Sequence, residues 1–325
     1  YQERLIGPFD AAWQPEGQPP LWRREDAPHV YAIPGNHDWY DGLNGFFGLF
    51  CRRRAPFTSE LGVDRAGRLI GGRASFQTRS YFALRLPGNW WLWGTDSQLK
   101  GYIDQPQIDY FQHCARHWMA PGSRVILCVG TPAWQYVRPE EAREGFSKFS
   151  YLERLAGEAR GPDGERMGHQ LKLVLTGDSH HYAHYSEGEG DAARHYLTCG
   201  GGGAFLHPTH HLGDQHFEYD YPPPGQRRRR GVDSYARHFR LGATFPSAAQ
   251  SRGLTRHNIA FAWKNKAFTL LMMAAAFVLA WLLDGNALDD EGMPVAALIG
   301  GQGLAAAFTG LSRLLPQSLL IPVVA

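Results

Sequence analysis

The sequence predicts an α/β fold, because short apolar segments typical of buried strands alternate with longer segments of helical composition. Each apolar segment stops at glycine, proline or a polar side chain, as strands do where they leave a core. The predicted strands are residues 30–33, 80–86, 90–93, 125–129, 171–175 and 195–199, and the predicted helices are residues 106–118 and 140–159.

Local patterns support each of these elements. Residues 30–33 are an apolar run that ends at a Pro-Gly turn. Residues 80–86 alternate apolar and polar side chains, as a half-buried strand does, whereas 125–129 have the apolar character of a fully buried one. Residues 106–118 begin with proline, which suits the first turn of a helix. Residues 140–159 carry apolar side chains near helical spacing.

Composition excludes several classes of protein. The chain has 325 residues, 43% of them hydrophobic, so it can bury a sizeable core, and its formal net charge of +2 predicts no specific nucleic-acid binding. Residues 227–230 are four arginines, which indicate a solvated loop tip or, less favoured, a contact with an anionic lipid or phosphate. The four cysteines lie far apart in the sequence and form no closely spaced pair, at Cys51, Cys114, Cys128 and Cys199. This spacing argues against a zinc ribbon or a disulfide scaffold and suits a reducing compartment. Cys128 and Cys199 lie in strand-like runs and are expected to be buried.

One turn, Gly35-Asn36-His37-Asp38, follows the first apolar run. Open α/β sheets keep their reactive side chains at the carboxyl ends of strands, where this turn is expected. The motif resembles the signature turn of the calcineurin-like metallophosphoesterases. The resemblance implies that Asn36 is a metal ligand and that His37 meets the scissile phosphate, with its ring oriented by Asp38. The alternative is an ordinary turn whose Asn and Asp side chains hydrogen-bond their own backbone.

Two further motifs match that family in part, and the resemblance covers roughly residues 1–211. The usual order is an Asp-x-His turn, a Gly-Asp turn, the Gly-Asn-His turn, and strands ending in His-x-Pro and in Gly-His-x-His. The first two would lie upstream of Tyr1, so the domain is expected to lack its amino-terminal part. Gly130 stands where His-x-Pro has its metal-binding His. Asp178 stands at the first His of the last motif, and His180 matches the second.

The resemblance implies a layered α/β/β/α sandwich with its ligands on loops at one edge. Asn36 and Asp178 would hold one divalent metal ion and His180 a second, the ions being Mn, Fe, Zn or Mg. A metal-activated hydroxide would attack a phosphomonoester or phosphodiester, with His37 as acid or transition-state stabiliser and Asp38 beside it. The missing His of the His-x-Pro motif leaves one metal in doubt.

Four other histidines are candidates for the site, namely His181, His207, His210 and His211. His181 directly follows the last motif, and the other three follow the glycines 200–203, which let the backbone approach a ligand closely. One of these three could replace the missing ligand, or they form a group of surface histidines. Asp96, at the end of another predicted strand, is expected to be structural.

Three regions are predicted along the chain: a metallophosphoesterase domain at 1–250, a basic juxtamembrane segment at 251–266 and a transmembrane region at 267–325. Residues 267–283 contain Thr269 as their only polar residue and, at 17 residues, are just long enough to cross a bilayer. Apolar stretches at 293–311 and from 314 onward follow. Basic residues before the first stretch and after the second predict a multi-pass protein of the cell membrane with a cytoplasmic catalytic domain.

The sequence therefore predicts a metal-dependent phosphoesterase that acts on a phosphoester and is tethered to a lipid bilayer. A non-catalytic membrane scaffold or binding protein is the alternative, because Gly130 and Asp178 depart from the family pattern. Membrane transport with an appended domain is a third possibility, if further spans follow Ala325. A membrane position would suit a lipid phosphate as substrate, but a soluble phosphodiester fits equally.

Overall fold

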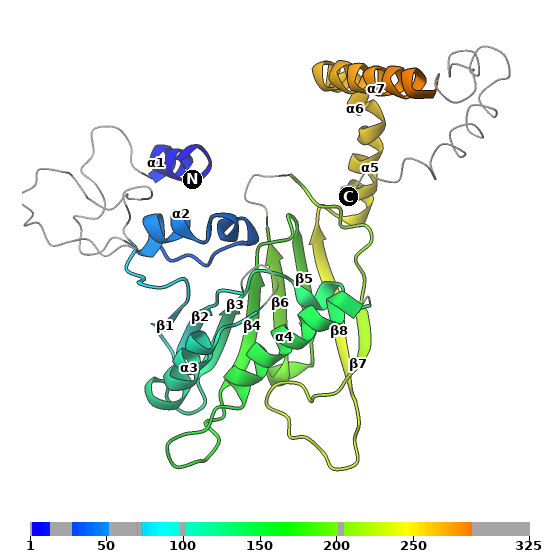
Figure 1. Cartoon of the computed structure of the whole chain (residues 1–325). Helices are drawn as coiled ribbons and strands as arrows, with labels where there is room; N and C mark the ends of the chain where they lie inside the picture. The colour runs from blue at the N-terminus through cyan, green and yellow to red at the C-terminus, as the bar shows by residue number, and fades with distance from the viewer. Residues whose placement is uncertain are drawn as a thin grey trace, which may run out of the picture. The chain divides into compact units, whose positions relative to one another are not determined.

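The computed structural model describes residues 2–13, 28–51, 70, 73, 75–97, 102–138, 140–200 and 205–287. The chain divides into two compact units, Tyr1–Arg252 and Gly253–Ala325, and each is described by itself. The first unit contains an eight-stranded sheet with helices packed against it (Figure 1). The mixed α/β class predicted from the sequence is therefore confirmed.

The strands lie across the sheet in the order β1-β2-β3-β4-β6-β5-β8-β7. Neighbouring pairs among β2, β3, β4 and β6 are parallel, so these four strands present their carboxyl ends at one edge of the sheet. The other pairs are antiparallel. The strands are β1 (Phe82–Leu86), β2 (Trp90–Gly94), β3 (Arg124–Cys128), β4 (Gln170–Thr176), β5 (Tyr182–Glu187), β6 (Arg194–Cys199), β7 (Gln215–Tyr219) and β8 (Tyr235–Phe245).

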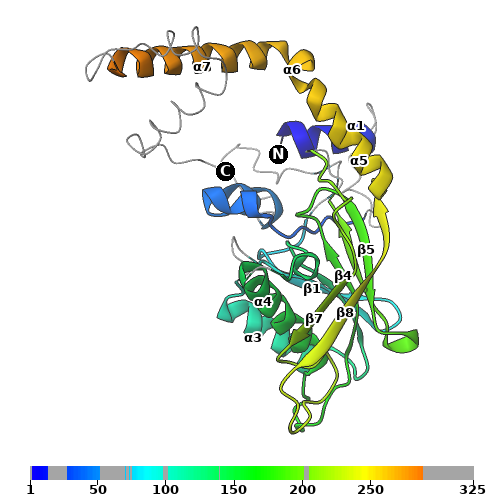
Figure 2. The ribbon, with the colours of Figure 1, turned by 90° about the vertical axis from the view of Figure 1, so that its right-hand side faces the viewer.

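Two helices, α3 (Gln105–His113) and α4 (Glu140–Gly157), cover one face of the sheet (Figures 1 and 2). The main core lies between them and the strands. Trp93 of β2 stacks on Phe111 of α3 with ring centroids 4.9 Å apart, and both side chains are fully buried. A wide helical turn at Cys114–Trp118 continues α3, so the two together match the helix predicted over 106–118.

The opposite face of the parallel strands is less covered, and we call it the open face. Its apolar side chains are only partly buried, at Leu92, Ile126, Leu173 and Leu197. Their neighbours along each strand point the other way, into the main core. Parallel sheets are usually covered on both faces, so this exposure is unusual for strands of this composition.

One predicted strand is wrong. Residues 30–33 form no strand, because the backbone of Ala32 pairs with a side chain instead. Its N–H donates to Gln77 Oε1 at 2.8 Å, and its carbonyl accepts from Gln77 Nε2 at 3.0 Å. The expected burial of Cys199 is also wrong, since this thiol is exposed, whereas Cys128 is partly buried.

Short helical segments precede the sheet, and a second apolar cluster lies among them. The cluster has Leu43, Phe46, Phe50 and Ile70 at its centre, with Leu5 and Phe9 packed against it. The segments are the wide turn η1 (Gln2–Ile6), α1 (Gly7–Trp13), the 3₁₀ turn η3 (Asn36–Asp41), α2 (Asn44–Phe46) and η4 (Phe47–Cys51).

The carboxyl-terminal unit is helical where the structure describes it. α5 (Ala248–Arg256) begins in the first unit and ends in the second. The other described helices of the second unit are η8 (His257–Ala260), α6 (Phe261–Lys264) and α7 (Lys266–Ala287). Among the described residues, no helix is both long and apolar enough to cross a lipid bilayer. This finding corrects the prediction of a transmembrane, multi-pass protein, for which the run at 267–283 offered only the minimum length. The other two predicted spans lie outside the described residues.

Candidate functional site

The Gly-Asn-His-Asp motif forms the beginning of η3. The Asp38 carboxylate accepts the Gly35 N–H at 2.8 Å, and Asn36 Oδ1 accepts the His37 N–H at 2.8 Å. Both side chains thus hold their own turn, as Asn and Asp commonly do. Asn36 and His37 are exposed, and the ring centroid of His37 lies 4.9 Å from that of Tyr40. The imidazole is therefore accessible to a ligand from solvent.

This turn is fixed to the carboxyl end of β2. The indole N–H of Trp39 donates to Asp96 Oδ1 at 2.9 Å, and Asp96 is 3% exposed. The side-chain amide of Gln107 in α3 accepts the Asp96 N–H through Oε1 and donates to the Asp96 carbonyl through Nε2, at 2.9 Å each. Asp96, expected to be structural, is thus the point at which the turn meets the strand. A Cβ at Gly94 would lie 2.8 Å from Ile33 Cγ2, so the run before the turn also packs closely here.

The ends of β3 and β4 meet at Gly130. Its carbonyl accepts the Thr176 hydroxyl at 2.7 Å and the Asp178 N–H at 3.2 Å. A Cβ at Gly130 would lie 3.0 Å from Ser97 Oγ, beyond the end of β2. A histidine at this position would therefore crowd Ser97, which gives a physical reason for the glycine. Asp178 is partly buried beside it.

His180 and His207 form a compact pair after β4 and β6. The His207 N–H donates to the His180 carbonyl at 2.9 Å, and the His180 N–H donates to His207 Nδ1 at 3.2 Å. Their rings stack with centroids 4.8 Å apart and 18° between planes. Since Nδ1 of His207 accepts a hydrogen bond, its Nε2 carries the proton in the neutral ring.

His181 is the most enclosed histidine of this group, with 1% of its surface exposed. Neither of its ring nitrogens has a hydrogen-bond partner within the part of the chain that the structure describes, and neither has the buried Nδ1 of His180. Burial, followed by the nearby His207, His211 and His180, lowers the pKa of His181 to about 4. The ring is therefore neutral at pH 7, which is the form that binds metals.

The remaining predicted histidines lie at the rim of this group. His210 Nδ1 is 2.9 Å from the Ser251 hydroxyl of α5, so one of its nitrogens already has a partner. His211 stacks on Tyr136 with centroids 6.2 Å apart, and burial lowers the pKa of His211. Burial raises the pKa of Tyr136, which therefore stays protonated near neutral pH.

The structure thus brings His180, His181 and His207 together. Among the described residues, no hydrogen bond or ring contact joins Asn36 or His37 to Asp178 or to these histidines. The two halves of the predicted site are connected through strand ends, along the contacts of Trp39 with Asp96, Ser97 with Gly130, and Gly130 with Asp178. The burial of His181 depends on this tertiary packing and leaves no signal in the sequence.

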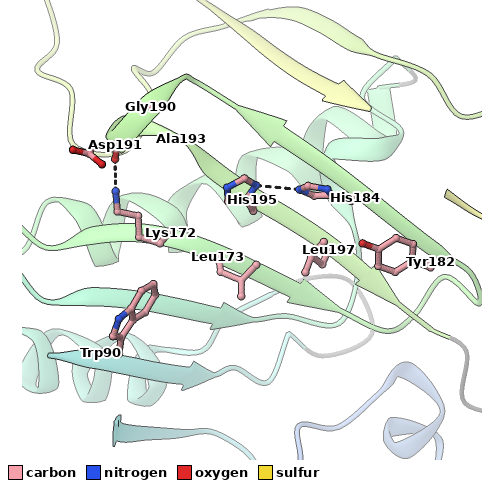
Figure 3. A pocket seen from close by; sticks show the side chains of 10 residues that line it. All are labelled: Trp90, Lys172, Leu173, Tyr182, His184, Gly190, Asp191, Ala193, His195 and Leu197. Atoms are coloured by element: carbon pink, nitrogen blue, oxygen red, sulfur yellow. Dashed lines mark hydrogen bonds between the residues drawn. The ribbon is translucent and has the colours of Figure 1, made fainter. Parts of the chain in front are cut away.

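Two features outside this edge were not predicted. Asp214, His216 and His238 offer ligand atoms that all lie within 4.8 Å of one another. A hollow of about 520 Å³ lies on the open face, where His184 Nε2 and His195 Nδ1 are 3.0 Å apart (Figure 3). Lys172 donates a hydrogen bond to the Asp191 carbonyl at its rim.

Comparison of the chain with protein-family models, with curated proteins and with solved structures finds no match in any of the three.

Proposed function

We propose that this protein is a metal-dependent phosphoester hydrolase related to the calcineurin-like metallophosphoesterases, with its site at the carboxyl ends of β2, β3, β4 and β6. The observation that carries the proposal is the close packing along this edge, from Trp39 to Asp96, and from the neighbouring Ser97 through Gly130 to Asp178. Gly130 and Asp178 follow the turn at Asn36 by about 90 and about 140 residues in sequence, and all three lie along the sheet edge at which α/β enzymes keep their reactive side chains.

The buried histidines fit a metal. Buried polar nitrogens are nearly always hydrogen-bonded, and leaving one without a partner costs about 1–3 kcal/mol. Three such nitrogens belong to two adjacent residues, namely both of His181 and Nδ1 of His180. A divalent cation bound to one nitrogen of each ring would give two of these atoms a partner, and the neutral ring of His181 is the form that binds a metal.

In this proposal Asn36, Asp178 and His180 hold the ions, and His181 supplies a further nitrogen ligand. His207 accepts the His180 N–H through Nδ1 and so orients His180. A mixed set of imidazole, carboxylate and amide suits Mn, Fe or Zn. Gly130 contributes no side chain, so the buried histidines replace the ligand that the His-x-Pro motif lacks. When bound, the ions activate water and polarise the phosphate.

The residues of the turn carry the proton chemistry. His37 is exposed at the surface of η3 and can donate a proton to the leaving oxygen of the ester. Asp38 holds Gly35 and so fixes the turn that presents His37. Trp39 fixes the same turn relative to β2.

The open face supports the proposed α/β/β/α arrangement. Its leucines and Ile126 are partly exposed on strands that run parallel and would normally be covered on both sides. A second sheet packed on this face would bury them and would complete the layers. The hollow around His184 and His195 lies on the same face (Figure 3).

The metal content of the full-length natural protein, supplied with manganese and measured per chain, tests the proposal. We expect two ions, with loss of metal in Asn36→Ala and in His180→Ala. His117→Ala, which removes an exposed histidine of the turn after α3, is the matched control and should change nothing. A protein that holds no manganese, or that keeps it in both variants, would show the enzyme proposal to be wrong and leave a binding module as the better account.

A further inference from the structure

The hairpin of β7 and β8 carries a second group of side chains of the types that bind metals. It is separate from the site proposed at the carboxyl ends of β2, β3, β4 and β6, which we call the strand-end site. Asp214 directly precedes β7, His216 lies within β7, and His238 lies within β8. Their ligand atoms are all within 4.8 Å of one another. No motif of the strand-end site includes any of the three.

Strand pairing brings the two histidines together. His216 and His238 are directly opposite in the antiparallel register, so their side chains leave the same face of the hairpin. Their rings stack with centroids 3.7 Å apart and 27° between planes. The register of the sheet therefore fixes the distance between these imidazoles.

The carboxylate is held in place from the other side. Asp214 Oδ1 accepts the backbone N–H of Leu241 at 2.7 Å, which leaves Oδ2 3.6 Å from His238 Nε2. A hydrogen bond that orients a ligand in this way is typical of metal sites. The side chains of His238 and Asp214 are 44% and 45% exposed, so an ion can reach them from solvent.

The hairpin differs in this respect from the other histidine pair of the sheet. His184 and His195 direct their ring nitrogens at each other, 3.0 Å apart (Figure 3). Among the described residues, no such ring-to-ring hydrogen bond joins His216 and His238, and a carboxylate lies beside them instead.

We propose that Asp214, His216 and His238 bind one zinc ion. Two imidazoles and one carboxylate form a common zinc set, in which the fourth position is left to water or to a group from another molecule. Ligand atoms around tetrahedral zinc lie roughly 3.4 Å apart, so small rotations of the rings close the site. The ion would link the edge strand β7 to its neighbour β8 and so stabilise this edge of the sheet.

Hydrogen exchange of the full chain, measured with and without zinc chloride, tests this site separately from the strand-end site. We expect zinc to slow exchange of the backbone amides in 215–219 and 235–241. His216→Ala and His238→Ala should each weaken this effect, with a dissociation constant at least about tenfold higher. His195→Ala, a histidine of the pair without a carboxylate, should behave as the unmodified protein.

Slower exchange of the backbone amides in residues 176–183 or 205–211 would indicate zinc at the strand-end site and would not be evidence for a site on the hairpin. Because all three hairpin side chains lie at the surface, the variants are expected to fold, and circular dichroism checks that they do. Exchange in the hairpin that zinc leaves unchanged would contradict the proposal. Protection that persists in both His216→Ala and His238→Ala would contradict it equally.

Discussion

The indole N–H of Trp39 donates a hydrogen bond to the buried carboxylate of Asp96, at 2.9 Å. This contact joins the turn that contains Asn36 and His37 to the carboxyl end of β2. It spans 57 residues of sequence, and it sets the place of the turn relative to the other strand ends. If the strand-end site binds metal, the bond positions one of its ligands.

Replacing Trp39 by Phe removes this hydrogen bond and keeps an aromatic ring. The free energy of unfolding should fall by about 1.5–3 kcal/mol, the usual value of a hydrogen bond to a charged group. Manganese affinity should fall more, by about 10–100-fold, as happens when a residue that positions a ligand is lost. Titration with manganese measures this, and Trp118→Phe, an indole that is 52% exposed, is the control. Equal affinities in the two variants would show that Trp39 has no positioning role.

A buried ion pair connects α4 with β8. Arg237 Nη2 lies 3.2 Å from Glu153 Oε2, and neither side chain is exposed. Arg237 also pairs with Glu187 of β5, and the Tyr196 hydroxyl of β6 lies within hydrogen-bond distance of both glutamates, 2.8 Å from Glu153 Oε1 and 2.9 Å from Glu187 Oε2. This network of buried side chains therefore connects four elements of the fold, α4, β5, β6 and β8.

Arg237→Met should lower the free energy of unfolding by about 3–5 kcal/mol, because the buried carboxylate of Glu153 then loses its partner cation. Glu187 keeps its ion pair with Arg194 at 3.1 Å. Arg240→Met is the matched control in the same strand, since its pair with Glu189 is 59% and 85% exposed. That change should cost less than about 1 kcal/mol. Urea denaturation of both variants measures the difference. Similar losses would mean that the buried network does not stabilise the fold.

A buried histidine predicts acid sensitivity. His169 is 3% exposed, and its Nε2–H donates to the Ala115 carbonyl at 2.9 Å. Burial lowers the pKa of His169 below the ordinary value of 6.5, although the hydrogen bond acts in the opposite direction. The unfolded chain therefore takes up a proton first as the pH falls.

The contribution of His169 to stability is thus complete above the ordinary histidine pKa and is lost as the pH falls below it. We expect the free energy of unfolding to decrease less in His169→Gln than in the unmodified protein between about pH 7.5 and about pH 5. Chemical denaturation at both values measures this. The same decrease in both proteins would show that His169 does not contribute.

Strands with apolar sequences could be predicted, and those that depend on tertiary pairing could not. Apolar runs gave β3 and β4 directly. In β8, by contrast, one of the fully buried residues is a cation, Arg237, whose place in the core follows only from its two glutamate partners. The strand expected at 30–33 failed because the Gln77 side chain takes the hydrogen bonds of Ala32 that a neighbouring strand would have taken.

The site was predictable to a similar degree. Asp178 and His180 could be placed at a strand end from the apolar run before them. The enclosure of His181 could not, since it depends on segments that follow β6. The pair of His216 and His238 arises only from the register of two strands that the sequence patterns missed.

Hydrolysis of bis(p-nitrophenyl) phosphate by the full-length protein loaded with manganese tests the central claim most directly. We predict turnover that a chelator abolishes and manganese restores. His37→Ala should lower the rate constant by about 100-fold or more, the range expected for loss of a general acid. His180→Ala should lower it through loss of metal, and His117→Ala should leave it unchanged. Absence of turnover with this ester and with p-nitrophenyl phosphate, or full turnover in His37→Ala and His180→Ala, would contradict the account.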